Sequence, residues 1–148
     1  VAAMLTTVLL CASVLFSRDY FGARYAELSR EEFMPGYCEA VGKAKELAGD
    51  DKAVLSTYAH LSAPFMLALY ESETPPEVFL DTVIWRDEAA EFRVATAFSG
   101  FTFGLPEDLS AIDLTKQVVI LHVSELESFP GLPDCAVSTF QDFAVVSR

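Results

Sequence analysis

Charge is missing from the first part of this 148-residue chain, because no Asp, Glu, Lys or Arg precedes Arg18. Beyond that point basic residues are few and scattered, with 10 Lys and Arg against 22 Asp and Glu and a net charge of −12. A chain without a basic cluster repels the phosphate backbone of nucleic acids, so nucleic-acid binding is not expected. The same lack excludes a polybasic patch for anionic lipid headgroups.

Cysteine and histidine are also few, which removes the usual metal-binding patterns. The three cysteines do not form a CxxC pair, and the two histidines have no adjacent carboxylate ligands. Cys11 lies in the apolar opening, where a thiol behaves as a small hydrophobic group. Cys38 and Cys135 would pair only in an extracytoplasmic domain that brings their Cα atoms close together. We expect no metal site and no cofactor.

What the sequence does have is an uncharged, apolar opening at residues 1–17. As a helix it would be roughly 26 Å long, slightly short of the ~30 Å hydrocarbon core of a bilayer. A buried helix should show a polar face, and a signal peptide should show a charged beginning. The aromatic residues that follow, Tyr20, Phe21 and Tyr25, suit a membrane–water interface. We therefore interpret Val1 as a cut in a longer chain and residues 1–17 as the C-terminal part of a membrane-spanning helix, with a buried helix and a signal peptide as alternatives.

Residues 18–148 show the alternating strand and helix patterns of one α/β domain. The continuous apolar run Gln117–Val123 predicts a central strand that is covered on both faces. Shorter strands are expected at Ala53–Tyr58, at Thr82–Trp85 and, as one final strand, in the C-terminal STFQDFAVVSR. FRVATAF is compatible with a strand or a helix. The prediction is a layered domain with a mostly parallel or mixed sheet of four or five strands.

Helices are expected between these strands, and their start and stop signals are clear. An amphipathic helix is predicted for residues 37–48, and a second helix for Ala63–Tyr70. The capping-box spacing of Thr74–Glu77 predicts a short helix after it, and Ser29 with Glu32 predicts a short turn. The expected core residues are Val54, Leu55, Leu67, Leu69, Val83, Val119, Ile120, Leu121 and Val145.

One place in the sequence is a candidate ligand site, the strand-to-helix connection that holds Tyr58, His60 and Ser62. Open α/β sheets bind ligands at the carboxyl ends of their strands, where these residues are expected. The alternative is an ordinary surface histidine, and His122 is interpreted as a hydrogen-bonded residue of the sheet. No GxGxxG or GxSxG motif is present, and the acidic pairs fall in expected turns, so no catalytic residue is expected.

Two stretches carry a family resemblance. YFGARYAELSREEFMPGYCEAVGKAKEL contains F-x-x-G-Y before an amphipathic helix, and SAPFMLALYESETPPEVF contains P-F-x-x-x-L-Y before a proline-rich turn. With the apolar opening, they resemble the region after the last membrane helix of bacterial integral-membrane glycosyltransferases, the relatives of protein O-mannosyltransferases and aminoarabinose transferase. The resemblance covers approximately Arg18 to Leu105.

The resemblance implies an enzyme that transfers a sugar from a polyprenyl-phosphate carrier to an acceptor outside the plasma membrane. It implies that residues 18–148 form a non-catalytic α/β domain on the extracytoplasmic face. The implied partners are membrane lipid, through the N-terminal helix, and an upstream transmembrane region that holds the catalytic carboxylates. Two alternatives are a membrane-anchored domain that binds or senses a small ligand and a soluble protein whose opening helix packs inside or mediates a dimer.

Overall fold

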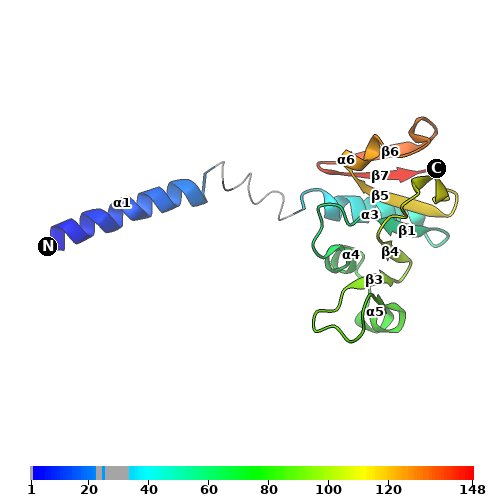
Figure 1. Cartoon of the computed structure of the whole chain (residues 1–148), viewed down its shortest axis with the longest axis horizontal. Coiled ribbons are helices and arrows are strands. Elements are labelled where there is room, and N and C mark those ends of the chain that lie inside the picture. The colour runs from blue at the N-terminus through cyan, green and yellow to red at the C-terminus, as the bar shows by residue number, and fades with distance from the viewer. Residues whose placement is uncertain (1, 23–24, 26–33) are drawn as a thin grey trace. The chain divides into compact units, whose positions relative to one another are not determined.

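The computed structural model describes residues 2–22, 25 and 34–148 (Figure 1). The chain divides into two compact units, Val1–Met34 and Pro35–Arg148. The turn predicted at Ser29 and Glu32 lies outside the described residues. All three cysteines are free thiols, so Cys38 and Cys135 are not paired.

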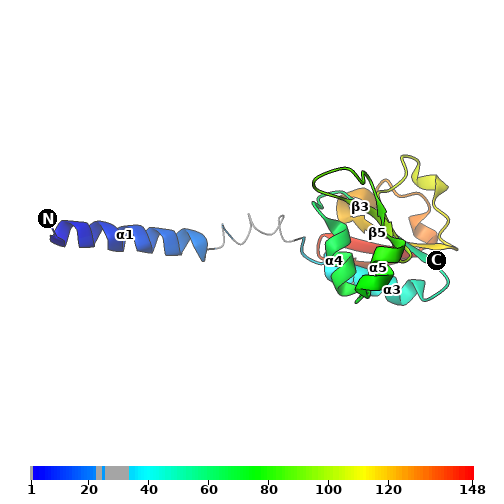
Figure 2. The same cartoon turned by 90° about the horizontal axis from the view of Figure 1, so that it is seen from below.

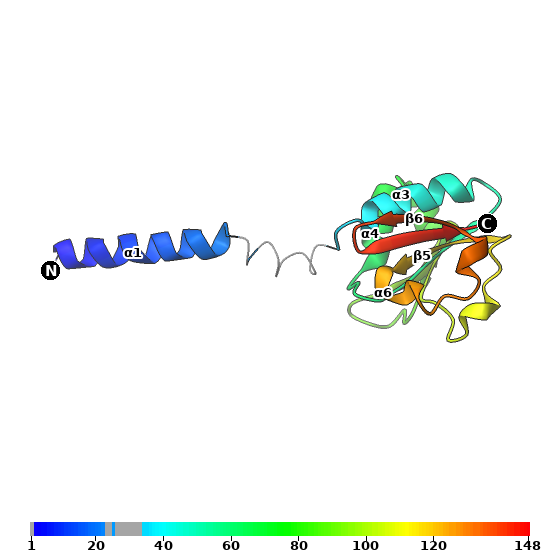
Figure 3. The same ribbon diagram turned by 90° about the horizontal axis from the view of Figure 1, so that it is seen from above.

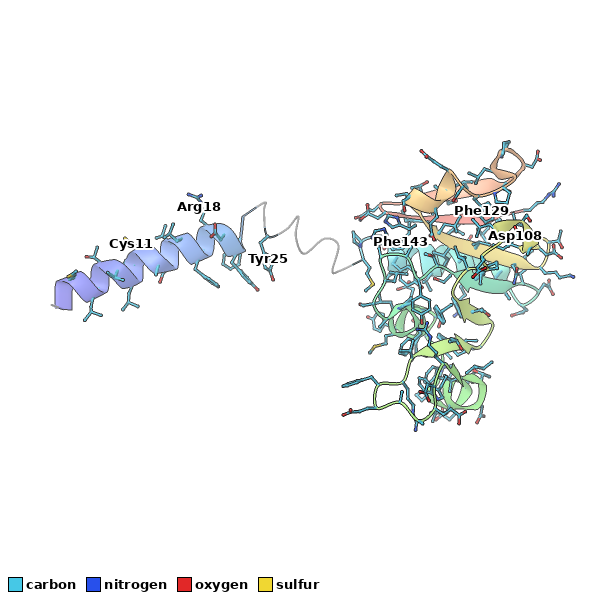
Figure 4. The ribbon with its side chains drawn as sticks, viewed as in Figure 1. Cys11, Arg18, Tyr25, Asp108, Phe129 and Phe143 are labelled. Atoms are coloured by element: carbon cyan, nitrogen blue, oxygen red, sulfur yellow. The ribbon has the colours of Figure 1, made fainter. Side chains whose placement is uncertain are left out.

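The first unit contains helix α1, Ala2–Tyr20, which covers the described residues of the uncharged opening. Its large apolar side chains stand away from the helix axis into the surroundings, as the sticks of Figure 4 illustrate. Phe16 stacks on Tyr20 at a centroid distance of 5.3 Å, and the Tyr20 ring also contacts Phe21 and Tyr25. Within the part of the chain that the structure describes, no helix has both the length and the apolarity needed to span a membrane.

The second unit is built on a seven-stranded mixed sheet of order β2-β3-β4-β1-β5-β7-β6. The three middle strands are parallel, because β1 pairs in parallel with β4 on one side and with β5 on the other. Antiparallel pairs extend the sheet outward on both sides. The strands are β1 Ala53–Ser56, β2 Ile84–Trp85, β3 Ala95–Phe98, β4 Phe101–Phe103, β5 Gln117–His122, β6 Ala136–Phe140 and β7 Phe143–Ser147.

Three helices cover one face of this sheet, as Figure 2 shows, and Figure 3 shows the first of them lying along that face. They are α3 Tyr37–Ala48, α4 Pro64–Glu71 and α5 Pro76–Thr82. Helix α3 follows the predicted pattern and buries five side chains against β1, β5 and β7. Leu47 of the same helix is 36% exposed. The Tyr37 ring packs edge-on against Phe143, so the start of α3 is fixed to β7.

The opposite face is covered by short helical turns and loops. These are the 3₁₀ turns η1 Leu109–Ala111 and η2 Leu132–Asp134 and the helix α6 Val123–Leu126. They enclose a core cluster in which Val119 and Leu121 of β5 meet Leu55, Phe129 and Val146. Because side chains alternate along a strand, Val118 and Ile120 point to the α3 side. The prediction that β5 is central and covered on both faces is confirmed.

The α/β class is confirmed, but the expected number of strands is wrong. The predicted final strand is two strands, β6 and β7, that turn at Gln141 and Asp142. FRVATAF contributes β3, and the neighbouring FTF contributes β4, which the sequence pattern did not reveal. The capping box expected at Thr74 is also wrong, because the N-cap position of α5 is Pro75 and Thr74 pairs with Ser72 Oγ instead.

Three of the expected core residues are less buried than the rest. Val54, Leu55, Val119, Ile120, Leu121 and Val145 are buried. Leu67, Leu69 and Val83 are only partly buried, because they lie in or beside the helical layer and not in the sheet.

Candidate functional site

The carboxyl ends of β1 and β5 meet at one edge of the sheet, because the two strands are parallel neighbours with Ser56 opposite Ile120. The residues that follow each strand therefore lie beside one another. We call this place the polar edge, and it consists of residues 57–62 after β1 and residues 122–125 at the end of β5. Both histidines of the chain belong to it.

His60 and His122 contact each other across the polar edge. Their ring centroids are 4.2 Å apart and the ring planes are tilted by 35°. The His122 ring also forms a T-shaped contact with Phe143, at a centroid distance of 5.5 Å. His60 adopts a left-handed backbone conformation, with φ of 58°, in an exposed turn. The interpretation of His122 as a sheet residue is correct for its backbone but misses this contact with His60.

The side chain of His122 caps helix α6. Its Nδ1 accepts a hydrogen bond from the backbone N–H of Ser124 at 3.2 Å and lies 2.7 Å from Ser124 Oγ. A nitrogen that accepts from a backbone N–H carries no proton, so the neutral ring has its proton on Nε2. The tautomer of His122 is thus fixed by the cap.

Glu125 joins the two halves of the polar edge. Its Oε2 accepts from the His122 backbone N–H at 2.9 Å, which completes a capping box. Its Oε1 accepts from the buried Thr57 hydroxyl at 3.0 Å. Thr57 Oγ1 in turn accepts from the backbone N–H of Ala59 at 2.9 Å. One carboxylate therefore holds the end of β1, the end of β5 and the start of α6 together.

Of the three residues predicted for the site, only His60 takes part in the histidine contact. Tyr58 turns toward the other side of β1, where its hydroxyl donates to the Ala95 carbonyl at 3.1 Å and its ring packs against Phe103. The Arg86 guanidinium lies 5.3 Å from the centre of the Tyr58 ring, within range of a cation–π contact. Ser62 is exposed at the end of the loop.

The electrostatic surroundings act on His122 in both directions. Partial burial lowers the pKa of His122, and the nearby His60 lowers it further. The carboxylates of Asp142 and Glu125 oppose this by favouring the charged ring. Because the pKa of His122 is lowered, its neutral imidazole is the favoured form at neutral pH. At Tyr58, burial raises the pKa, and the Arg86 charge acts against the rise.

The polar edge can hydrogen-bond a ligand, but its geometry is not that of a hydrolase. A serine hydroxyl 2.7 Å from an imidazole nitrogen can be an activated nucleophile. Here the same nitrogen accepts from the Ser124 backbone N–H, which is the contact of a helix cap. Thr57 is 1% exposed and thus closed to a substrate. Over the described ranges, no group of three or more His, Cys, Asp or Glu side chains is placed to hold a metal ion.

Two surface cavities lie away from the polar edge. One, of about 290 Å³, has apolar walls from Leu109, Ile112 and Phe129 and a polar rim that includes Arg148. The other, of about 300 Å³, lies at the amino end of β1 beside Lys45 and Lys52. Both lysines already donate to backbone carbonyls, of Ser72 and Arg148 respectively. Neither cavity is lined by Tyr58, His60 or Ser62.

Comparison of the chain with protein-family models, with curated proteins and with solved structures finds no match.

Proposed function

We propose that this chain is the membrane-attached, extracytoplasmic part of a glycosyltransferase that takes its sugar from a polyprenyl-phosphate carrier. In this proposal α1 lies in lipid, and the α/β unit is a non-catalytic domain whose polar edge contacts the acceptor. The observation that carries the proposal is the exposed apolar surface of α1, which ends in a cluster of aromatic rings.

The surface of α1 supports attachment to lipid. Eight large apolar side chains between Met4 and Phe16 are each 58% exposed or more. Covering such side chains stabilises a protein by roughly 1.5–3 kcal/mol each. The rings of Phe16, Tyr20, Phe21 and Tyr25 contact one another at the end of the apolar surface, and Arg18 is the first charged residue of the sequence there. Aromatic and basic residues in this order are typical of the headgroup layer.

The polar edge supports a binding role and not a chemical one. His122 Nδ1 is used by the cap of α6, and both Glu125 oxygens are used by hydrogen bonds within the domain. The His60 imidazole and the Ser62 hydroxyl lie at the surface, and they suit a hydroxylated ligand. The transferase activity itself rests on the resemblance in sequence, which assigns the catalytic carboxylates to another part of the enzyme.

Flotation with phosphatidylcholine vesicles tests the lipid attachment. The chain should float with the vesicles, and binding should survive high salt because it depends on apolar burial and not on charge. Leu9→Glu should weaken binding, since Leu9 is 64% exposed on α1. Leu80→Glu is the matched control, because this leucine of α5 is 69% exposed in the other unit. Equal loss from both variants would contradict a lipid role for α1.

The reading frame that encodes the chain tests the enzyme class. Several further hydrophobic spans upstream, with acidic residues in the first outer loop, would support the glycosyltransferase. A single span would favour the ligand sensor instead. In the whole enzyme, His60→Ala should lower acceptor use while the domain stays folded, and the present chain alone should transfer no sugar. Unchanged turnover in His60→Ala would remove the polar edge from the acceptor site.

A further inference from the structure

We propose that His60 and His122 form an acid-sensitive latch at the polar edge. When both imidazoles are neutral, they hold the turn after β1 against the capped start of α6, and protonation releases both segments. This inference goes beyond the proposed function and does not depend on it, because it concerns the conformation of the domain and not the reaction.

The first part of the latch is the cap of α6. His122 Nδ1 holds the Ser124 N–H as an acceptor, at 3.2 Å. Protonation of Nδ1 would convert this acceptor into a donor that faces another donor, so the cap would be lost. The Ser124 hydroxyl can rotate and accept from the new N–H, but the backbone N–H then has no partner within the cap. Acid therefore acts directly on the start of α6.

The second part is the contact between the two rings. The centroids of the His60 and His122 rings are 4.2 Å apart. Two imidazolium ions at this distance repel each other, so a charge on one ring disfavours protonation of the other. His60 is exposed and lies on a short turn, so it is the residue of the pair that can move away. Protonation of both rings should move the turn of His60 away from β5.

Three charged or titratable groups face His122, and each comes from a different element. They are His60 on the turn after β1, Glu125 on α6 and Asp142 in the turn between β6 and β7. The two carboxylates favour the charged ring, whereas His60 and burial oppose it. The Glu125 oxygens are already hydrogen-bonded to Thr57 Oγ1 and to the His122 N–H. Burial and His60 outweigh the two carboxylates, so the pKa of His122 is lowered.

Release of α6 would reach the core, because two of its contacts besides the cap lead there. Glu125 links it to Thr57 at the end of β1, and Leu126 packs against the core cluster around Val119 and Leu121. A helix of one turn that loses its N-cap has few other hydrogen bonds to hold it. The expected result of acid is a loosened α6 and an opened polar edge, on a sheet that stays intact.

The direction of the pH effect follows from the pKa of His122. A histidine whose pKa is lowered in the folded state binds fewer protons there than in the unfolded chain. Its contribution to stability is fully present above the unfolded value of about 6.5 and is lost as the pH falls below it. The latch should thus be closed at pH 7.5 and should open progressively in mild acid.

The test is a pH titration of the full chain in nonionic micelles, followed by NMR. The chain has two histidines, so the two ring C–H signals can be assigned by substitution. We expect the Ser124 and Glu125 amide signals to shift at the same pH as the His122 ring. In His122→Asn these amides should no longer respond, because asparagine is a good N-cap that does not titrate.

A second variant, His60→Asn, tests the ring contact separately. Asparagine tolerates the left-handed conformation at position 60, so the turn should keep its backbone. Removal of His60 should raise the titration midpoint of the His122 ring. The proposal is overturned if the His122 ring titrates while the Ser124 amide stays unchanged, or if His60→Asn leaves the His122 midpoint where it was.

Discussion

The hydrogen bond between Tyr37 and Ser56 ties α3 to β1, and its removal gives a sharp test of the packing. The Tyr37 hydroxyl lies 2.8 Å from Ser56 Oγ, and both residues are fully buried. Ser56 donates to the Thr57 carbonyl at 3.2 Å, so its oxygen accepts from Tyr37. Burial raises the pKa of Tyr37 well above its ordinary value, so the hydroxyl stays protonated and can donate.

Two single substitutions should have unequal costs. Tyr37→Phe keeps the ring against Phe143 and removes one hydrogen bond, which should cost about 1 kcal/mol of the free energy of unfolding. Ser56→Ala leaves the Tyr37 hydroxyl buried without its acceptor, and a stranded buried group costs about 1–3 kcal/mol. The double variant has no stranded donor, so its cost should fall below the sum of the single costs by roughly 0.5 kcal/mol or more.

Urea unfolding followed by circular dichroism measures these costs, with the full chain in nonionic micelles. The fluorescence of Trp85, the sole tryptophan, supplies a second probe. A loss of 1 kcal/mol should lower the melting temperature by about 4 °C. Tyr70→Phe is the matched control, because Tyr70 on α4 is 79% exposed and its substitution should change little. Strict additivity of Tyr37→Phe and Ser56→Ala would refute the direct hydrogen bond.

Three further predictions concern the packing of the domain. Gly36→Ala should lower the free energy of unfolding by more than about 2 kcal/mol. The reason is that φ at Gly36 is 85° and an added Cβ would lie 2.0 Å from the Phe140 carbonyl oxygen. Chemical denaturation measures this loss. Leu121→Asp should abolish cooperative unfolding, because it places an unpaired carboxylate at a position with 0% exposure. The control Leu80→Asp, on the surface of α5, should unfold cooperatively. Deletion of residues 1–17 should leave a folded domain that needs no detergent, and an aggregated product would show that α1 belongs to the domain core.

The sequence allowed the centre of the fold to be predicted better than its borders. Gln117–His122 was recognisable as a strand because its apolar residues are continuous, and α3 because its small and apolar residues recur at helical spacing. The hairpin of β6 and β7 was hidden, because the positive φ of its turn falls on Gln141 and not on a glycine or asparagine. The hairpin of β3 and β4 did carry a signal in Ser99-Gly100, which both have positive φ.

The composition of the polar edge was only half predictable, and the reason lies in how parallel strands are paired. The position of His60 after a strand is a local feature and can be read from the sequence. Its contact with His122 depends on the pairing of β1 with β5 and on the register that sets Ser56 opposite Ile120, which no local pattern encodes.

The same pairing explains why His122 belongs to the site at all. A histidine at the end of an apolar strand would serve only to cap α6 if β5 had another neighbour. Because β1 is that neighbour, and because the turn after β1 takes a left-handed residue at position 60, the centroid of the His60 ring lies 4.2 Å from that of His122. Glu125 then fixes the ends of both strands through Thr57 and the His122 N–H. The chemistry of this edge is therefore a property of the sheet order, and a substitution that shifts the register of β1 against β5 should separate the two histidines without touching either.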